Sequence, residues 1–321
     1  VFARGIDLEA KGTIPHLLFF AFQGTFAIIT AALVSGAVVG RMRFGAYVAF
    51  ITAWILLVYA PVTHWVWGGG WVDEVLGALD FAGGAVVHVN AGAAALVAAY
   101  VLGPRRDFGR QALIPHNVPF VLLGAGLLWF GWFGFNGGSA LAADGIAVLA
   151  FANTMLAPAA TLLVWTGLDL MYTSKVTAVG LATGIVVGLV SITPAAGFVS
   201  PMSALLIGAI AAPPSYFALK WRARTRLDDS LDVFAAHGLG GIMGALLTGV
   251  FADASLGGTN GLLLGNPWQL GAQALSVVAV FAYSGVLTFG ILKGIALVMP
   301  LRVEDRHERQ GLDIANQGEE A

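Results

Sequence analysis

Nine apolar stretches, each close to the length that crosses a lipid bilayer, follow one another along this chain of 321 residues. A membrane-spanning helix needs about 20 apolar residues. Inside lipid the backbone must satisfy its own hydrogen bonds, so only helices and closed barrels can cross, and these stretches are too long and too uniformly apolar for strands. We therefore predict an all-α membrane protein, a polytopic helical bundle. The predicted spans are residues 14–39, 44–62, 83–102, 118–135, 140–169, 176–198, 202–218, 233–251 and 270–297.

Composition supports a membrane protein. Hydrophobic residues make up 58% of the chain and charged residues 11%, and the mean hydropathy is +0.83. A water-soluble domain of this length could not present such a composition on its surface. The net charge of −2 says nothing about nucleic acid, but the sequence has no basic patch of the kind that would require such a partner, and none is expected. The chain has no cysteine, which removes disulfide and thiolate chemistry.

The lysines and arginines indicate how the chain crosses the membrane. If the first span enters from the outside, 14 of the 16 basic residues lie on the inner side, and only Arg4 and Lys11 lie outside. Because basic residues gather in cytoplasmic loops, we predict a multi-pass protein of the cell (inner or plasma) membrane with a cytoplasmic C-terminus. The expected organisation is an extracytoplasmic loop at 1–13, a transmembrane domain at 14–300 and a cytoplasmic tail at 301–321.

Two acid–histidine pairs interrupt the apolar runs. Asp80 is followed eight residues later by His88, and Asp229 is followed at the same interval by His237, so the two pairs are 149 residues apart. Such a copy indicates an internal duplication. The second copy lies five spans after the first, so its helix must cross in the opposite direction. The pattern predicts two inverted halves with a site near the bilayer midplane, where the halves meet.

The spacing also predicts that the imidazoles of His88 and His237 meet. Eight helical residues rise about 12 Å, close to half of a hydrocarbon core about 30 Å thick. Ionisable side chains inside the membrane usually mark a substrate or ion path; the alternative is two unrelated core histidines with satisfied hydrogen bonds. Asp80 and Asp229 can act structurally as helix caps, which does not exclude a function. No metal-ligand spacing links the other histidines, and no cofactor is expected.

Aromatic residues collect at the predicted outer ends of the spans. They include Phe22, Phe26, Trp67 and Phe135, with the hydroxyl of Ser139 close to the last of them in sequence. Aromatic residues at such positions usually form the interfacial belt. Ring faces also attract ammonium-type cations, so these residues are candidates for a cation site of low charge.

Several separated segments together resemble one family. They are DFAGGAVVH (80–88), GWFGFNGGS (131–139), DVFAAHG (232–238), and RVED with GLD (302–305 and 311–313). The segments are similar to the ammonium transporter (Amt/Mep/Rh) family, and closer to its bacterial Amt branch. The resemblance covers essentially the whole chain. It implies a fold of eleven helices, ten of which form two inverted halves of five, and a homotrimer with one pore per subunit.

The resemblance also implies roles for the outer residues. Phe22, Phe26, Trp67 and Ser139 correspond to the site that recruits ammonium from outside. Phe26 and Phe135 correspond to a stacked gate below that site. The implied partners are therefore ammonium or ammonia as the substrate and the lipid bilayer as the solvent.

By the same resemblance, Asp80 is the acid below the recruitment site, His88 and His237 are the twin-histidine pore pair, and Asp229 is the inverted counterpart of Asp80. The tail around Gly311-Leu-Asp313 is implied to couple subunits and to answer a P-II-type nitrogen regulatory protein at the cytoplasmic face.

One feature departs from the family. Nine spans are predicted where the family has eleven, and the first span here corresponds to the family's third. We therefore expect the chain to lack the first two transmembrane helices, one of which lines the pore, as a fragment or through an alternative start. We expect these 321 residues alone not to transport ammonium.

A dry pore would select ammonium over potassium by chemistry rather than by size. A charge at the bilayer centre costs at least about 2.5 kcal/mol. Ammonium avoids that cost by giving up a proton, and potassium has none to give. We expect capture at the outer aromatic site and passage as ammonia past the histidines, with or without a separately relayed proton. The alternatives are an ammonium sensor that signals through its tail and an intramembrane metal enzyme, which lacks a third ligand near the midplane. The chain is expected not to be an enzyme.

Overall fold

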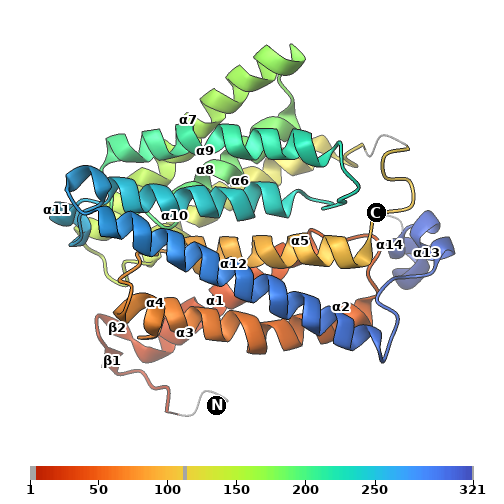
Figure 1. The fold of residues 1–321 in the computed structure, drawn as a ribbon, viewed down its shortest axis with the longest axis horizontal. Helices are drawn as coiled ribbons and strands as arrows, with labels where there is room; N and C mark the ends of the chain where they lie inside the picture. Colours follow the sequence, from red (N-terminus) through yellow and green to blue (C-terminus); the bar gives the residue numbers. More distant parts are fainter. Residues whose placement is uncertain (1–4, 111–113, 320–321) are drawn as a thin grey trace.

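The computed structural model describes residues 5–110 and 114–319 and consists almost entirely of helices (Figure 1). Eight helical segments among the described residues are long and apolar enough to cross a membrane. The stretch predicted at 176–198 forms a shorter apolar helix, α8, of 15 residues. The predicted helical membrane bundle is confirmed.

The elements are, in chain order, β1 (Ala10–Lys11), β2 (Ile14–Pro15), α1 (His16–Ser35), α2 (Phe44–Trp54), η1 (Ile55–Tyr59), α3 (Ala60–Trp67), α4 (Trp71–Glu74), η2 (Gly84–Val89), α5 (Asn90–Leu102), α6 (Val118–Gly138), α7 (Gly145–Thr173), α8 (Ala178–Ile192), α9 (Pro201–Arg222), η3 (Phe234–Gly238), α10 (Leu239–Phe251), α11 (Ala254–Gly257), η4 (Leu262–Leu264), α12 (Pro267–Ala296), α13 (Asp305–Gln310) and α14 (Leu312–Gln317). The span predicted to end at residue 62 continues through η1 and α3 to Trp67. Residues 14–15, predicted inside the first span, instead form β2, which pairs with β1. The turn between these strands contains Gly12, whose φ of 79° suits a residue without a side chain.

The two ends of the bundle carry different parts of the chain. Figure 1 shows the β1–β2 hairpin, α4 and α11 at one end, and α13 and α14 at the other. The loop predicted to be outside is thus separated by the length of the bundle from the C-terminal segment. The orientation of this axis in a cell membrane remains a prediction, and Arg4 lies outside the described residues.

The two halves of the chain contain matching helices at the predicted offset. Helices α5 and α10 each have 13 residues, and both of their ends are offset by 149 residues, the separation of the two histidines. They run in opposite directions, because the end of α5 and the segment before η3 meet at one side chain. Arg41 donates there to the carbonyl oxygens of Gly103 and Asp228. The inverted duplication predicted from the acid–histidine pairs is present in the fold.

Glycines let the two inverted helices touch at their backbones. A Cβ atom on Gly92 would lie 2.3 Å from the Cα of Gly238, and one on Gly241 would lie 2.9 Å from both the carbonyl oxygen of Gly84 and the Cβ of His88. These separations are far below the contact distance of carbon atoms, about 3.5 Å or more. Small residues allow such close approach between membrane helices. The η2–α5 and η3–α10 segments are therefore in direct backbone contact near the two histidines.

A π-helical turn precedes each of these α-helices. η2 carries His88 and η3 carries His237. π-helical turns are rare and occur frequently at functional sites. Residues at matching positions before the two turns have left-handed backbones: Gly83 has a φ of 111° and Asp232 a φ of 57°. The duplication therefore preserves the backbone shape of the turn as well as the histidine.

Candidate functional site

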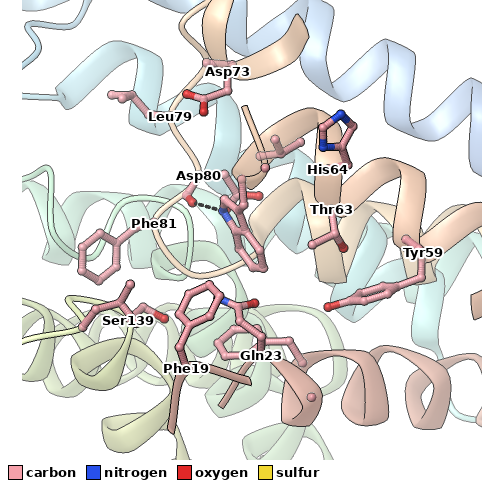
Figure 2. Close-up of a pocket in the computed structure, with 18 of the residues that line it drawn as sticks. Phe19, Gln23, Tyr59, Thr63, His64, Asp73, Leu79, Asp80, Phe81 and Ser139 are labelled. Carbon is pink, nitrogen blue, oxygen red and sulfur yellow. Dashed lines mark hydrogen bonds between the residues drawn. The ribbon is translucent and has the colours of Figure 1, made fainter. Parts of the chain in front are cut away.

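A cavity of about 800 Å³ opens at the end of the bundle that carries the β1–β2 hairpin (Figure 2). Its lining includes Phe26 from α1, Trp67 from α3, Ser139 after α6, and Asp80 before η2. Four of the residues to which the resemblance assigns a role are thus brought to one cavity from four separate segments. The Ser139 hydroxyl donates to the carbonyl of Phe135 (2.8 Å), so its oxygen keeps lone pairs for another partner.

Aromatic rings form the inner part of this cavity. The Phe26 ring lies edge-on to Trp67 at 5.5 Å between centroids and packs against Phe135 at 4.4 Å with an interplanar angle of 30°. Phe22 contacts Phe26 at 5.0 Å but is not among the residues that line the cavity. The lining contains neither His88 nor His237, so the cavity ends at the level of Phe26.

Polar groups that the sequence did not single out also line the cavity. Figure 2 shows Gln23, Tyr59 and Thr63 beside it. Gln23 Oε1, the Tyr59 hydroxyl and Thr63 Oγ1 are buried and have no hydrogen-bond partner among the described residues. Gln23 and Tyr59 lie within two predicted spans and Thr63 directly follows the second of them, and nothing in the local pattern distinguishes these residues from other polar residues there.

The first histidine lies directly beneath the paired phenylalanines. The His88 ring centroid is 6.3 Å from that of Phe135, and the ring stacks on Trp132 at 5.5 Å with an interplanar angle of 13°. Sequence analysis missed Trp132 as a site residue. A signal was available, because Trp132 precedes Phe135 by three positions and residues three apart share a helix face. The Trp132 indole is itself held by a hydrogen bond to Thr193 Oγ1 (2.9 Å).

The two predicted histidines meet. Nδ1 of His88 lies 3.2 Å from Nδ1 of His237, and the rings are 5.3 Å apart between centroids with an interplanar angle of 24°. One nitrogen must donate and the other accept, which two neutral imidazoles can do. The His88 side chain is 1% exposed, and its Nε2 is buried without a partner among the described residues. An unpaired ring nitrogen in an apolar place is available to a small polar molecule.

Asp80 caps the helix that carries His88. Its carboxylate oxygens accept from the N–H groups of residues Gly83 (2.9 Å), Gly84 (2.5 Å), Ala85 (2.8 Å) and Val86 (3.1 Å). These are the free donors at a helix start, and a carboxylate there also suits the helix dipole. The predicted capping role is confirmed for Asp80.

The loop around Asp80 is fixed from three sides. The Asp80 carbonyl accepts from the indole N–H of Trp67 at 2.7 Å, the bond drawn in Figure 2. The side chain of Gln273 in α12 both accepts from the Leu79 N–H (2.6 Å) and donates to the Leu79 carbonyl (2.7 Å). The N–H of Phe81 donates to the carbonyl of Pro194. The first half therefore holds its acid rigidly against the core.

Asp229, the inverted counterpart of Asp80, accepts fewer hydrogen bonds than Asp80 does. The Asp229 carboxylate accepts from the Phe234 N–H (2.7 Å), and its buried Oδ1 has no partner among the described residues. Asp232, in the position that glycine occupies in the first half, forms an ion pair with Arg222. Burial raises the pKa of Asp232 to about 6, although the charge of Arg222 opposes that shift. Capping by Asp229 is confirmed, but the two halves are chemically unequal.

Comparisons with known proteins agree on one family. The model of the Ammonium Transporter Family matches residues 4–321. The chain is 50% identical over 323 residues to an ammonium transporter of Aquifex aeolicus, covering 100% of this chain and 75% of the relative. It is 46% identical to an ammonium transporter of Bacillus subtilis, covering 98% of this chain and 78% of the relative.

Solved structures give the same result. The crystal structure of Saccharomyces cerevisiae Mep2 superposes with a TM-score of 0.86 at 37% identity, covering 91% of this chain and 68% of Mep2. Eight long apolar helices, the inverted halves and these relatives together describe a multi-pass membrane protein of the transporter class rather than an enzyme. The chain belongs to the ammonium transporter family.

Proposed function

We propose that the protein conducts ammonium as ammonia along a path from the outer cavity, through the Phe26–Phe135 pair, to the two histidines. The observation that carries this proposal is the order of the groups along the path. The aromatic cavity comes first, the packed pair of Phe26 and Phe135 follows, and His88 lies next to Phe135. A ring nitrogen of His88 is 3.2 Å from one of His237. Phe22, Phe26, Trp67 and Ser139 form the proposed recruitment site, although Phe22 acts only through its contact with Phe26.

The outer cavity suits a small cation that still carries its protons. An ammonium ion over the Trp67 and Phe26 rings would gain about 0.5–2 kcal/mol from cation–π attraction. Ser139 offers hydroxyl lone pairs, and the carboxylate of Asp80 lies at the same cavity. The carboxylate of Asp73 also lines the cavity, whereas that of Asp80 is engaged by four backbone N–H groups.

The path below the phenylalanines favours a neutral species. Moving a charge to the bilayer centre costs at least about 2.5 kcal/mol, and among the described residues no carboxylate is hydrogen-bonded to either histidine ring. Ammonia can accept from one imidazole N–H and donate to another ring nitrogen, whereas potassium can do neither. The proton either returns to outer water or follows separately along the histidines, and the current across reconstituted membranes distinguishes these two cases.

The proposal predicts that His88→Ala will impair transport. We expect uptake of labelled methylammonium to fall by about tenfold or more, the effect of losing one buried hydrogen bond on the path, and potassium exclusion to weaken. Uptake is measured in transport-deficient cells that express the complete open reading frame, with surface expression quantified. His116→Ala, in an exposed loop, is the matched control. Unchanged flux and potassium exclusion in His88→Ala would contradict the proposal.

A second prediction separates recruitment from the interfacial belt. Trp67→Leu should raise the apparent KM for ammonium by about threefold to thirtyfold, the loss of one cation–π contact, while the maximal rate changes little. Trp65→Leu is the control, since the Trp65 ring packs on Trp71 and Tyr283 rather than on the cavity. Equal KM values for the two variants would assign both tryptophans to the belt.

Three wider features of the proposal rest on the family resemblance and on charge. The protein is proposed to sit in the cell membrane with its C-terminus in the cytoplasm, since 14 of its 16 basic residues then lie inside. It is proposed to assemble as a homotrimer and to bind a P-II-type regulatory protein at that face. Native mass spectrometry tests the trimer, and co-purification with the regulator tests the partner. A protein that binds ammonium but shows no uptake would be a sensor instead.

A further inference from the structure

The π-helical turn η2, which carries His88, begins between two hydrogen-bonding registers. The Gly83 carbonyl accepts from the N–H of Val87 (2.9 Å), four residues on, and also from the N–H of His88 (3.1 Å), five residues on. The first bond is that of an α-helix and the second is that of a π-helix. The backbone bonds at the start of the turn therefore do not decide between the two registers.

A side chain takes the place of a backbone donor at the other end of the turn. In an α-helix the N–H of Asn90 would donate to the carbonyl of Val86, four residues earlier. In η2 this N–H donates to the carbonyls of Ala85 and Val87 instead. The Nδ2 of Asn90 donates to the Val86 carbonyl at 3.1 Å. The amide thus supplies a donor to Val86 in place of the N–H that the π register takes away.

Other bonds hold this arrangement from both sides. The Val86 N–H donates to the Asp80 carboxylate (3.1 Å), so two side chains bind the backbone of Val86. The Asn90 carbonyl accepts from the Ser284 hydroxyl (2.8 Å) of α12, a helix that packs against α5 (Figure 1). Asn90 and Ser284 are both 0% exposed. A continuous line of buried bonds therefore runs from α12, past the turn that carries His88, to the Asp80 cap.

The Asn90 side chain makes its bond to Val86 although another of its groups stays unpaired. Asn90 Oδ1 is buried and has no hydrogen-bond partner among the described residues. An unpaired buried acceptor is unfavourable, so an apolar residue would suit this position better if the amide donor had no role.

We propose that Asn90 is a positioning residue for His88: its amide holds η2 in the register in which the His88 ring meets His237. The inference rests on the proposed function, because that function gives His88 a place on the path. A shift of one residue between registers corresponds to a rotation of about 100° around the helix axis. Such a rotation would turn position 88 away from His237, whose Nδ1 now lies 3.2 Å from that of His88.

The second half of the chain restrains its π-helical turn differently. Leu239 stands at the position that matches Asn90, and leucine has no side-chain donor. The start of η3 instead carries the ion pair of Asp232 with Arg222, at the position where the first half has Gly83. Glycine restrains its own backbone less than other residues do. The first turn therefore depends more on a restraint at its other end, where Asn90 lies.

A matched pair of variants separates the donor of Asn90 from its bulk. Threonine and valine have the same shape, and a threonine hydroxyl can donate to the carbonyl four residues earlier, as Thr30 does to the Phe26 carbonyl. We expect Asn90→Thr to keep the contact between the histidine rings and Asn90→Val to lose it. Nitrogen NMR of the purified full-length protein with isotope-labelled histidine, in lipid bilayers, detects the paired Nδ1 atoms. His88→Ala and His237→Ala identify their signals.

The expected loss in Asn90→Val is large enough to measure. The signal of the paired rings and the uptake of labelled methylammonium should each fall by about tenfold, the effect of losing one buried hydrogen bond. If Asn90→Val does not yield folded protein, Asn90→Ser and Asn90→Ala give the same comparison with smaller side chains.

Thr248→Val is the matched control in the other inverted helix. Thr248 is 0% exposed, and its hydroxyl donates to the Gly244 carbonyl (2.8 Å) within the regular α-helix α10. This variant loses the same kind of side-chain bond as Asn90→Val, but away from a π-helical turn. We expect its paired-ring signal and its uptake per folded molecule to stay unchanged, even where its midpoint of thermal unfolding falls.

An intact paired-ring signal in Asn90→Val would overturn the inference. Equal losses in Asn90→Thr and Asn90→Val would do the same, because side-chain shape rather than the donor would then be the cause. Loss of the signal in Thr248→Val would mark general destabilisation and also overturn it. If Asn90→Val loses the signal but keeps full uptake, the positioning role stands and the proposed conduction path fails, so the two failures are distinguishable.

Discussion

Replacing Gly92 with alanine is expected to remove most transport activity without touching either histidine. The new Cβ would lie 2.3 Å from the Cα and 2.6 Å from the nitrogen of Gly238, both backbone atoms that cannot rotate away. The two helices must separate by more than about 1 Å to restore a carbon contact of about 3.5 Å. Because Gly92 lies one turn after His88, and Gly238 directly follows His237, this separation widens the 3.2 Å contact between the rings.

The expected size of the Gly92→Ala effect follows from two sources. Overpacking a tight contact costs about 1–3 kcal/mol of folding stability, so the midpoint of thermal unfolding in detergent should fall. Uptake per folded molecule should fall by about tenfold or more, since a misplacement near 1 Å at a reacting site can cost about a hundredfold. Gly124→Ala is the control, because a Cβ there meets nothing within 4 Å. Full activity in Gly92→Ala would show that the histidine contact is not required.

Much of the site was predictable because its spacing is set by helix geometry. The offset of 149 residues between the acid–histidine pairs required an inverted duplication, and the rise per residue placed both imidazoles near the same depth. The structure brings His88 and His237 into contact and gives both Asp80 and Asp229 a capping bond. These features depend only on chain direction and regular helix dimensions, which the order of the residues contains.

Features that depend on tertiary contacts were not predictable in the same way. An apolar run has the same composition whether it forms an α or a π turn, so η2 and η3 left no signal. Arg41 and Arg105 contributed to the prediction only as charges on the inner side, yet Arg41 is fully buried and both bind Asp228. Trp132 lies within the GWFGFNGGS segment, but its role was not predictable because its stacking on His88 depends on how α6 packs.

Asp80 and Asp229 accept different numbers of backbone hydrogen bonds, and we expect this difference to appear as a large difference in stability between their variants. Asp80→Ala should destabilise the fold by more than about 3 kcal/mol, because it strands four buried N–H donors that the carboxylate now satisfies. Asp229→Ala removes one such bond and should cost about 1 kcal/mol. Asp80→Asn keeps one acceptor oxygen and should fall between them. Thermal unfolding of the purified variants measures all three.

Transport should follow the same order for a separate reason. The Asp80 carbonyl holds the Trp67 indole, and its carboxylate fixes the first turn of the His88 helix, so Asp80→Ala disturbs the outer cavity and the histidine together. Asp229→Ala leaves the outer cavity intact, and we expect its uptake per folded molecule to exceed that of Asp80→Ala by about tenfold. Equal losses of stability and uptake in the two variants would show that the two halves act alike. The two acids would then position His88 and His237 equally well, although they accept different numbers of hydrogen bonds.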